Sequence, residues 1–118
     1  MNYILFNKGK TPEYLKYCIN SILSCDKNSK IYLITNQNIK FNNINIIQMK
    51  ELAEGDDFKN SQIKVSNSEL LLSFEKLFYI NKLIKKINIE QFVHFDNNVI
   101  IYQPFSNIEP FAKNLKTQ

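Results

Sequence analysis

The residues best suited to chemistry are Asp96, Asn97 and Asn98, which lie between two apolar runs at 92–95 and 99–102. One carboxylate and two amides offer oxygen ligands for a hard divalent cation, with water and phosphate oxygens completing the coordination shell. Asp and Asn also favour turns, because their side chains bond to the nearby backbone. The triplet is therefore either a ligand site or a simple turn.

Three further apolar runs, at 3–6, 31–35 and 44–47, predict strands in addition to those expected at 92–95 and 99–102. The first two of these runs are apolar at successive positions, as is typical of parallel strands covered by helices on both faces. We therefore expect an α/β fold with three layers, in which a mostly parallel sheet is flanked by helices, built as a single domain over residues 1–118.

Helical patterns occur between these strands. Thr11 is placed to cap a helix over 12–25, and residues 49–54 predict one short helical turn. A long helix is expected to start at one of the capping residues at 66–68 and to end near 87–88. Its expected apolar stripe consists of Leu70, Leu71, Phe74, Leu77, Phe78 and Ile84.

Polar residues follow three of the predicted strands. Asn7 and Asn36 come after the first two strands, and Asp96 opens the polar triplet after the strand at 92–95. In open parallel sheets, ligands bind in the crevice beyond the carboxyl ends of the strands. The sequence therefore predicts one polar rim on which these residues gather.

Other titratable residues favour structural roles. His94, the single histidine, lies inside a predicted strand, so we expect a packed or partly exposed imidazole rather than a catalytic base. Glu75 and Lys76 are interpreted as an ordinary surface pair. Asp56 and Asp57 could hold a cation, although a solvated turn is the favoured interpretation.

The cysteines and glycines exclude several classes of site. Cys18 and Cys25 lie about two turns apart on one predicted helix, and a gap of roughly 10 Å is too long for a disulfide. Free thiols are typical of a reducing cytosol. With only two glycines, the sequence has no glycine-rich phosphate loop of either common kind.

The net charge of +4 comes from lysines, since all fifteen basic residues are lysine. Lys82, Lys85 and Lys86 cluster at helical spacing, which favours a solvated helix face. Without arginine or an aromatic and basic platform, we expect no nucleic-acid partner. The N-terminus has no signal-peptide pattern, and no apolar run approaches the ~18 residues of a membrane span, so a cytoplasmic location is expected.

The order of elements, together with the stretch VHFDNNVIIY at 93–102, resembles the N-terminal half of bacterial GT-A glycosyltransferases. In that fold a short Asp-x-Asp motif ends a strand that follows a long helix. The resemblance covers residues 3–105. It implies a Rossmann-like, incomplete donor-binding half that binds a UDP- or GDP-linked sugar with Mn²⁺ or Mg²⁺.

The resemblance also implies roles for single residues. Asp96 matches the first Asp of the motif, which contacts the ribose or the metal, and Asn98 matches the last Asp, the metal ligand. Asn98 departs from the family because a neutral amide binds metal more weakly. Lys76 takes the place of a phosphate-contacting arginine, and Asn7 and Asn36 match the region that holds the base.

Several alternatives stay open at this point. The implied acceptor is a glycan or a lipid-linked molecule of polysaccharide biosynthesis, which would place the protein at the inner face of the membrane. Acceptor-side groups normally follow the metal motif, so the chain is expected to be a fragment or a reduced donor-binding half, and its status as an enzyme is uncertain. The rival hypothesis is a non-catalytic α/β module that forms homo-oligomers or binds another protein.

Overall fold

The structure, a computed structural model, describes residues 1–53 and 68–102. Within these residues the chain forms a four-stranded sheet with the strand order β3-β2-β1-β4. The strands are β1 (Asn2–Asn7), β2 (Lys30–Thr35), β3 (Asn45–Gln48) and β4 (Val93–His94). All three strand pairings are parallel, so the carboxyl ends of the strands meet at one edge of the sheet.

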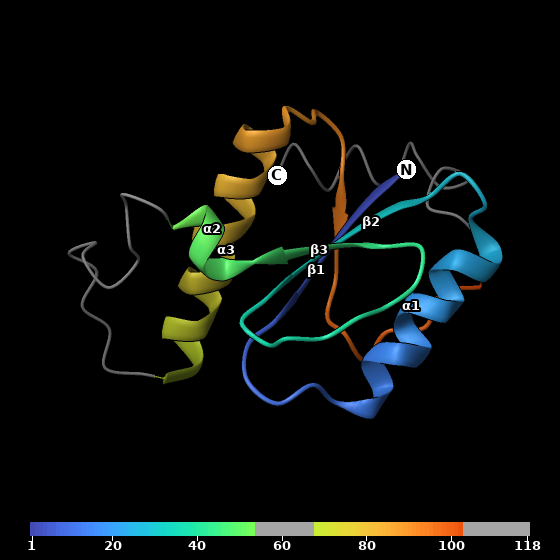
Figure 1. Cartoon of the computed structure of the whole chain (residues 1–118), viewed down its shortest axis with the longest axis horizontal. Helices are drawn as coiled ribbons and strands as arrows, with labels where there is room; N and C mark the ends of the chain where they lie inside the picture. Colours follow the sequence, from blue (N-terminus) through green and yellow to red (C-terminus); the bar gives the residue numbers. More distant parts are fainter. Residues whose placement is uncertain (54–67, 103–118) are drawn as a thin grey trace.

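Helices cover both faces of this sheet, as Figure 1 shows. The helix α1 (Glu13–Cys25) lies on one face, while α2 (Met49–Leu52) and α3 (Ser68–Ile87) lie on the other. The predicted three-layer α/β class is therefore confirmed. Because the described strands are all parallel, the sheet is more regular than the mostly parallel arrangement expected from the sequence.

Successive residues of β1 pack into two hydrophobic clusters, one on each face of the sheet. This explains why its apolar run does not alternate with polar residues. Tyr3 and Leu5 face α1 and pack with its buried side chains. Ile4 and Phe6 face α3 and pack with Tyr79 and others from that layer. Burial of both faces makes β1 the centre of the molecule.

The polar turn after α1 is held by a buried carboxylate. Asp26 accepts a hydrogen bond from the hydroxyl of Tyr3 at 2.8 Å and another from the backbone N–H of Asn28 at 3.2 Å. A tyrosine hydroxyl inside a core needs such a partner, because an unpaired buried polar group is costly. The contact ties the end of α1 to the start of β1.

Three expectations about the elements are wrong. The helix α1 starts at Glu13, and its N-cap is Pro12 without a side-chain cap bond, so Thr11 does not cap it. Residues 99–102 form no strand. Ile101 donates its backbone N–H to Ser21 Oγ of α1 at 3.2 Å, which draws this segment onto the helix instead of into the sheet.

The third error concerns the apolar stripe of α3. Phe74 and Leu77 are exposed, and the buried face instead carries Glu75, Tyr79, Ile80 and Leu83. Tyr79, Ile80 and Leu83 recur at helical spacing and define this buried face, and the carboxylate of Glu75 lies on it in an ion pair described below. Leu71, Phe78 and Ile84 are partly buried against the core, as expected.

Both cysteines are free thiols, as predicted. Cys18 is fully buried on the α1 side of the sheet, and burial raises the pKa of its thiol to about 11. The pKa of Cys25 is also raised, first by burial and then by the nearby Asp26. Lys85 and Lys86 are exposed as expected, while Lys82 lies over the ring of Phe78, 5.5 Å from its centroid.

Candidate functional site

A pocket of about 240 Å³ opens at the carboxyl edge of the sheet and contains the whole Asp96–Asn98 triplet. It is formed by the end of β1, the start of α1, the middle of α3 and the segment after β4. The remaining lining residues are Phe6, Tyr14, Lys76, His94 and Phe95. Residues from four separate segments thus converge where parallel α/β sheets usually bind ligands.

Lys76 and Asp96 meet in this pocket. The Nζ of Lys76 lies 3.4 Å from Oδ1 of Asp96, and the carboxylate is largely exposed while the lysine is more enclosed. Such an exposed and rather long ion pair contributes about 0–1 kcal/mol, so little free energy is needed to open it. Both charges can therefore take a ligand as a new partner.

The triplet itself forms a turn, in which Val99 N–H donates to the carbonyl of Asp96 at 3.2 Å. Asn97 fixes this turn to the sheet, since its Nδ2 donates to the carbonyl of Phe6 at 2.7 Å. Asp96 and Asn98 on either side are exposed. The turn and the ligand site are therefore compatible interpretations, with Asn97 as the anchor and its two neighbours exposed to solvent.

One atom of the anchor is left unsatisfied. Oδ1 of Asn97 is buried and has no hydrogen-bond partner within the part of the chain that the structure describes. Orphaned buried acceptors are rare and carry a cost of about 1–3 kcal/mol. The turn is thus under-satisfied at the position where the pocket is formed.

His94 also lines the pocket, which the sequence reasoning did not foresee. Its Nδ1 lies 2.8 Å from the carbonyl of Ile4, its register partner on β1, and the ring is partly buried as expected. In the neutral ring this contact assigns the proton to Nδ1 and leaves Nε2 as an acceptor. The period-2 pattern of a strand gives no signal that its end curves into a pocket.

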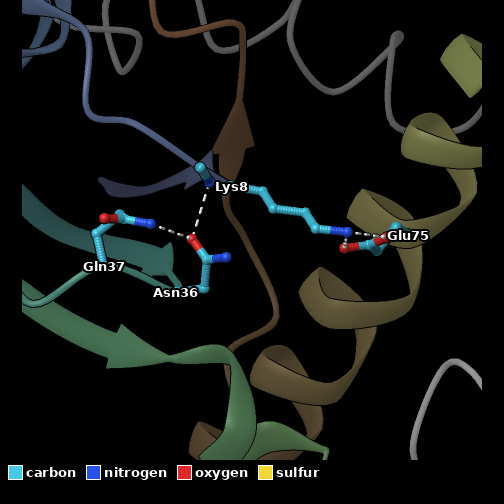
Figure 2. Close-up of polar contacts among 5 residues, drawn as sticks. Lys8, Asn36, Gln37 and Glu75 are labelled. Atoms are coloured by element: carbon cyan, nitrogen blue, oxygen red, sulfur yellow. Dashed lines mark hydrogen bonds and ion pairs between the residues drawn. The ribbon is translucent and has the colours of Figure 1, made fainter.

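Asn7 and Asn36, which were expected to hold the base of the nucleotide, do not line this pocket. Asn36 Oδ1 accepts hydrogen bonds from the backbone of Gly9 at 2.8 Å and from Gln37 Nε2 at 3.2 Å (Figure 2). Asn7 Nδ2 donates to the carbonyl of Gly9 at 3.4 Å. Gly9 has a φ of 89°, a conformation that favours glycine, so the two amides hold this tight loop between β1 and α1. A role for them in ligand binding stays a prediction.

The loop is also joined to α3 by an ion pair across the carboxyl edge (Figure 2). Lys8 Nζ lies 2.9 Å from Oε1 of Glu75, whose side chain is only 8% exposed. Glu75 and Lys76 are therefore not a surface pair, because each bonds to a distant residue. A buried carboxylate requires such a partner, and the contact joins the loop to the part of α3 that also carries Lys76.

Metal ligands are sparse at this site. Within residues 1–53 and 68–102, no three His, Cys, Asp or Glu side chains are grouped so as to hold a metal ion. Asp96 offers one carboxylate and Asn98 one amide oxygen, so a divalent cation would need oxygens from a bound ligand to complete its shell. Asp56 and Asp57 lie outside the described residues.

A search of the described residues for membrane-spanning helices finds none of sufficient length and apolarity. Comparison of the chain with protein-family models, curated proteins and solved structures finds no match. The glycosyltransferase resemblance therefore stays a prediction based on the motif and the order of elements.

Proposed function

We propose that this chain is the donor-binding half of a GT-A-like glycosyltransferase and binds the diphosphate of a UDP- or GDP-linked sugar. The observation that carries the proposal is the meeting of Lys76 and Asp96 in one pocket at the carboxyl edge of a parallel sheet. The two residues are twenty positions apart on different elements. Lysine is a common point-charge partner of phosphate, which supports this ligand class.

The size of the pocket limits what it encloses. Its volume of about 240 Å³ is below the ~300–1,000 Å³ of most small-molecule sites, so it suits a diphosphate with part of one adjoining sugar. Lys76 contacts the phosphates, and Asp96 accepts a hydrogen bond from a ribose hydroxyl or faces a cation. Phe6, Tyr14 and Phe95 also line the pocket, whose surface is mostly polar.

Asp96 and Asn98 would hold Mn²⁺ or Mg²⁺ together with phosphate oxygens. A bound cation would neutralise the charge that develops on the departing nucleotide diphosphate. Since one carboxylate and one amide are a weak pair of ligands, we expect metal to enhance nucleotide binding rather than to be required for it. The acceptor, a glycan or a lipid-linked molecule, has no residues assigned to it, and no catalytic residue is assigned.

Calorimetric titration tests this proposal. UDP-glucose and GDP-mannose are titrated into the protein with and without Mn²⁺, and Asp96→Ala is compared with Asn81→Ala, a variant on the exposed side of α3. We expect saturable binding of at least one nucleotide sugar that Asp96→Ala weakens and Asn81→Ala does not. Absence of binding by both ligands, or identical behaviour of Asp96→Ala and the wild type, would refute the proposal.

A second candidate, a non-catalytic module that self-associates, is favoured by a different observation. Phe74 and Leu77, which are three positions apart on one side of α3, are 38% and 63% exposed, so the helix presents apolar side chains on its outer surface. Exposed apolar patches often mark protein interfaces. Light scattering coupled to size exclusion separates the candidates, since a tight dimer that ignores nucleotide sugars supports the module and a nucleotide-binding monomer supports the transferase half.

A further inference from the structure

A second pocket, of about 430 Å³, lies on the α1 side of the sheet. One wall is the side of α1, and the other is the connection between β2 and β3, residues 36–44. Among the described residues, its lining shares none with the pocket around Asp96. Nothing proposed above uses this second pocket, so any role for it is independent of nucleotide-sugar binding.

The base of the pocket is apolar and is part of the core. Ile19 of α1 is 1% exposed, and Leu23 and Phe41 pack against the same buried cluster. Because these side chains belong to a close-packed core, the base is preformed and does not have to assemble around a ligand. It offers an aliphatic and aromatic surface to an apolar group.

The rim of the pocket is positively charged. Lys16 and Lys40 line it and are exposed, and none of its lining residues among those the structure describes is acidic. Within the described residues neither lysine takes part in an ion pair, whereas Lys8 and Lys76 each pair with a carboxylate. Two lysines that have no ion-pair partner among the described residues lie beside an apolar pocket floor. This arrangement favours binding of an anion that carries an apolar group.

Amides complete the rim. Asn20 projects from α1, and Asn42 and Asn43 come from the connection, where Asn43 has a φ of 65°. A left-handed residue at this point gives a sharp bend that brings the two neighbouring amides to one side of the pocket. Amide N–H groups donate to phosphate oxygens without adding charge, which suits recognition of a phosphate ester.

We infer that this second pocket binds a phosphate monoester or diester that carries an apolar group. Lys16 and Lys40 contact the phosphate, the three asparagines donate hydrogen bonds to it, and the apolar group lies against Phe41. The same chemistry is found in soluble organic phosphates and in phospholipid headgroups, and the test below distinguishes these two sources.

Chemical-shift titration of the full ¹⁵N-labelled chain tests the soluble source, with phenyl phosphate as the probe. Inorganic phosphate and phenol serve as its two separate parts. We expect saturable shifts at residues 16–23 and 40–43, with phenyl phosphate binding at least about tenfold more tightly than either part. Equal affinity for inorganic phosphate would overturn the inference, because the apolar base would then contribute nothing.

The double variant Lys16→Gln/Lys40→Gln tests the role of the two lysines. Its control is Lys85→Gln/Lys86→Gln, because this variant removes the same charge from exposed positions on the opposite face of the sheet. Loss of two phosphate contacts should weaken phenyl phosphate binding by about tenfold, while the control binds like the wild type. An unchanged affinity in Lys16→Gln/Lys40→Gln contradicts the inference.

Co-sedimentation with vesicles tests the lipid source. Binding to phosphatidylglycerol vesicles, but not to phosphatidylcholine vesicles, that is lost in Lys16→Gln/Lys40→Gln and kept in Lys85→Gln/Lys86→Gln assigns the pocket to a headgroup. Saturable binding of phenyl phosphate without vesicle binding assigns it to a soluble ligand. If neither probe binds in a way that depends on Lys16 and Lys40, the inference is wrong.

Discussion

Asp96, Asn97 and Asn98 divide two tasks among three adjacent residues. Asn97 donates a hydrogen bond from its side-chain amide to the carbonyl of Phe6 and fixes the turn, while both neighbours remain exposed. A turn with one inward and two outward side chains can keep its shape while the outer residues change. Substitutions at Asp96 and Asn98 should therefore report on ligand binding rather than on folding.

Asn98→Asp is the substitution that tests the weakened metal site. A second carboxylate beside Asp96 adds a charged oxygen ligand, so we expect Mn²⁺ to bind about tenfold more tightly than to the wild type. Calorimetry with MnCl₂ measures this change. Asn81→Asp, which adds the same charge on the exposed surface of α3, should leave the affinity unchanged, and an equal gain in both variants would contradict a site at Asp96.

The ion pair of Lys8 with Glu75 predicts an asymmetric effect of mutation. Lys8→Met leaves the buried carboxylate of Glu75 without its partner, which should cost about 1–3 kcal/mol of unfolding free energy. Glu75→Gln removes the charge that needs a partner and should cost less. Urea unfolding measures both variants. Equal and negligible effects would mean that the pair behaves as an ordinary surface contact.

The buried thiol of Cys18 predicts a loss of stability in alkali. The unfolded thiol releases its proton near pH 9.0, while the folded thiol keeps it until about pH 11. Between these values the unfolded chain binds fewer protons, so the free energy of unfolding falls as the pH rises. The loss is on the order of 2 kcal/mol. Urea unfolding from pH 8 to 11 should show a smaller decrease in Cys18→Ala than in the wild type, and parallel curves would contradict this prediction.

Among the elements, α3 shows how a helix rich in apolar residues can offer more than one apolar face. Phe74 and Leu77 were expected in the core, yet Tyr79, Ile80 and Leu83 are buried there instead, with Glu75 on the same face. The pairing of Glu75 with Lys8 joins residues far apart in sequence, and no local pattern predicts it. Lys76 follows Glu75 on this helix and lies beside Asp96, so the orientation of α3 also determines which of its residues reach the pocket.

This orientation predicts which leucines of α3 stabilise the fold. Leu83 is fully buried and Leu77 is 63% exposed. Leu83→Ala should therefore lower the unfolding free energy by about 2–5 kcal/mol. Leu77→Ala should change it by less than about 0.5 kcal/mol. Thermal or urea unfolding distinguishes the two. A larger loss from Leu77→Ala would support the stripe expected from the sequence instead.

For the whole molecule, the layers could be predicted because continuous apolar runs such as 3–6 and 31–35 require cover on both faces of a sheet. The segment 99–102 reads as a strand by the same rule, but its backbone N–H at Ile101 bonds to Ser21 of α1. A single sequence carries no signal for that choice between two partners. Local sequence patterns do not predict contacts between segments that are distant in the sequence.

Part of the candidate site could also be predicted from the sequence. Lys76, Asp96 and Asn98 do gather in one pocket, because strand ends and the helix before β4 converge at the carboxyl edge. Asn7 and Asn36 reach the same edge, but they are engaged by the loop at Gly9. A polar residue at a strand end is equally suited to bind a ligand or to hold a loop, and only the three-dimensional structure distinguishes these roles.

We propose that the pocket around Lys76 and Asp96 recognises a nucleoside diphosphate. The most direct measurement is a calorimetric comparison of UDP and GDP with uridine and guanosine, for the wild type, Lys76→Gln and the control Lys85→Gln. We predict that at least one diphosphate binds about tenfold or more tightly than its nucleoside, and that only Lys76→Gln removes this difference. Equal binding of diphosphate and nucleoside, or an unchanged preference in Lys76→Gln, would contradict the claim.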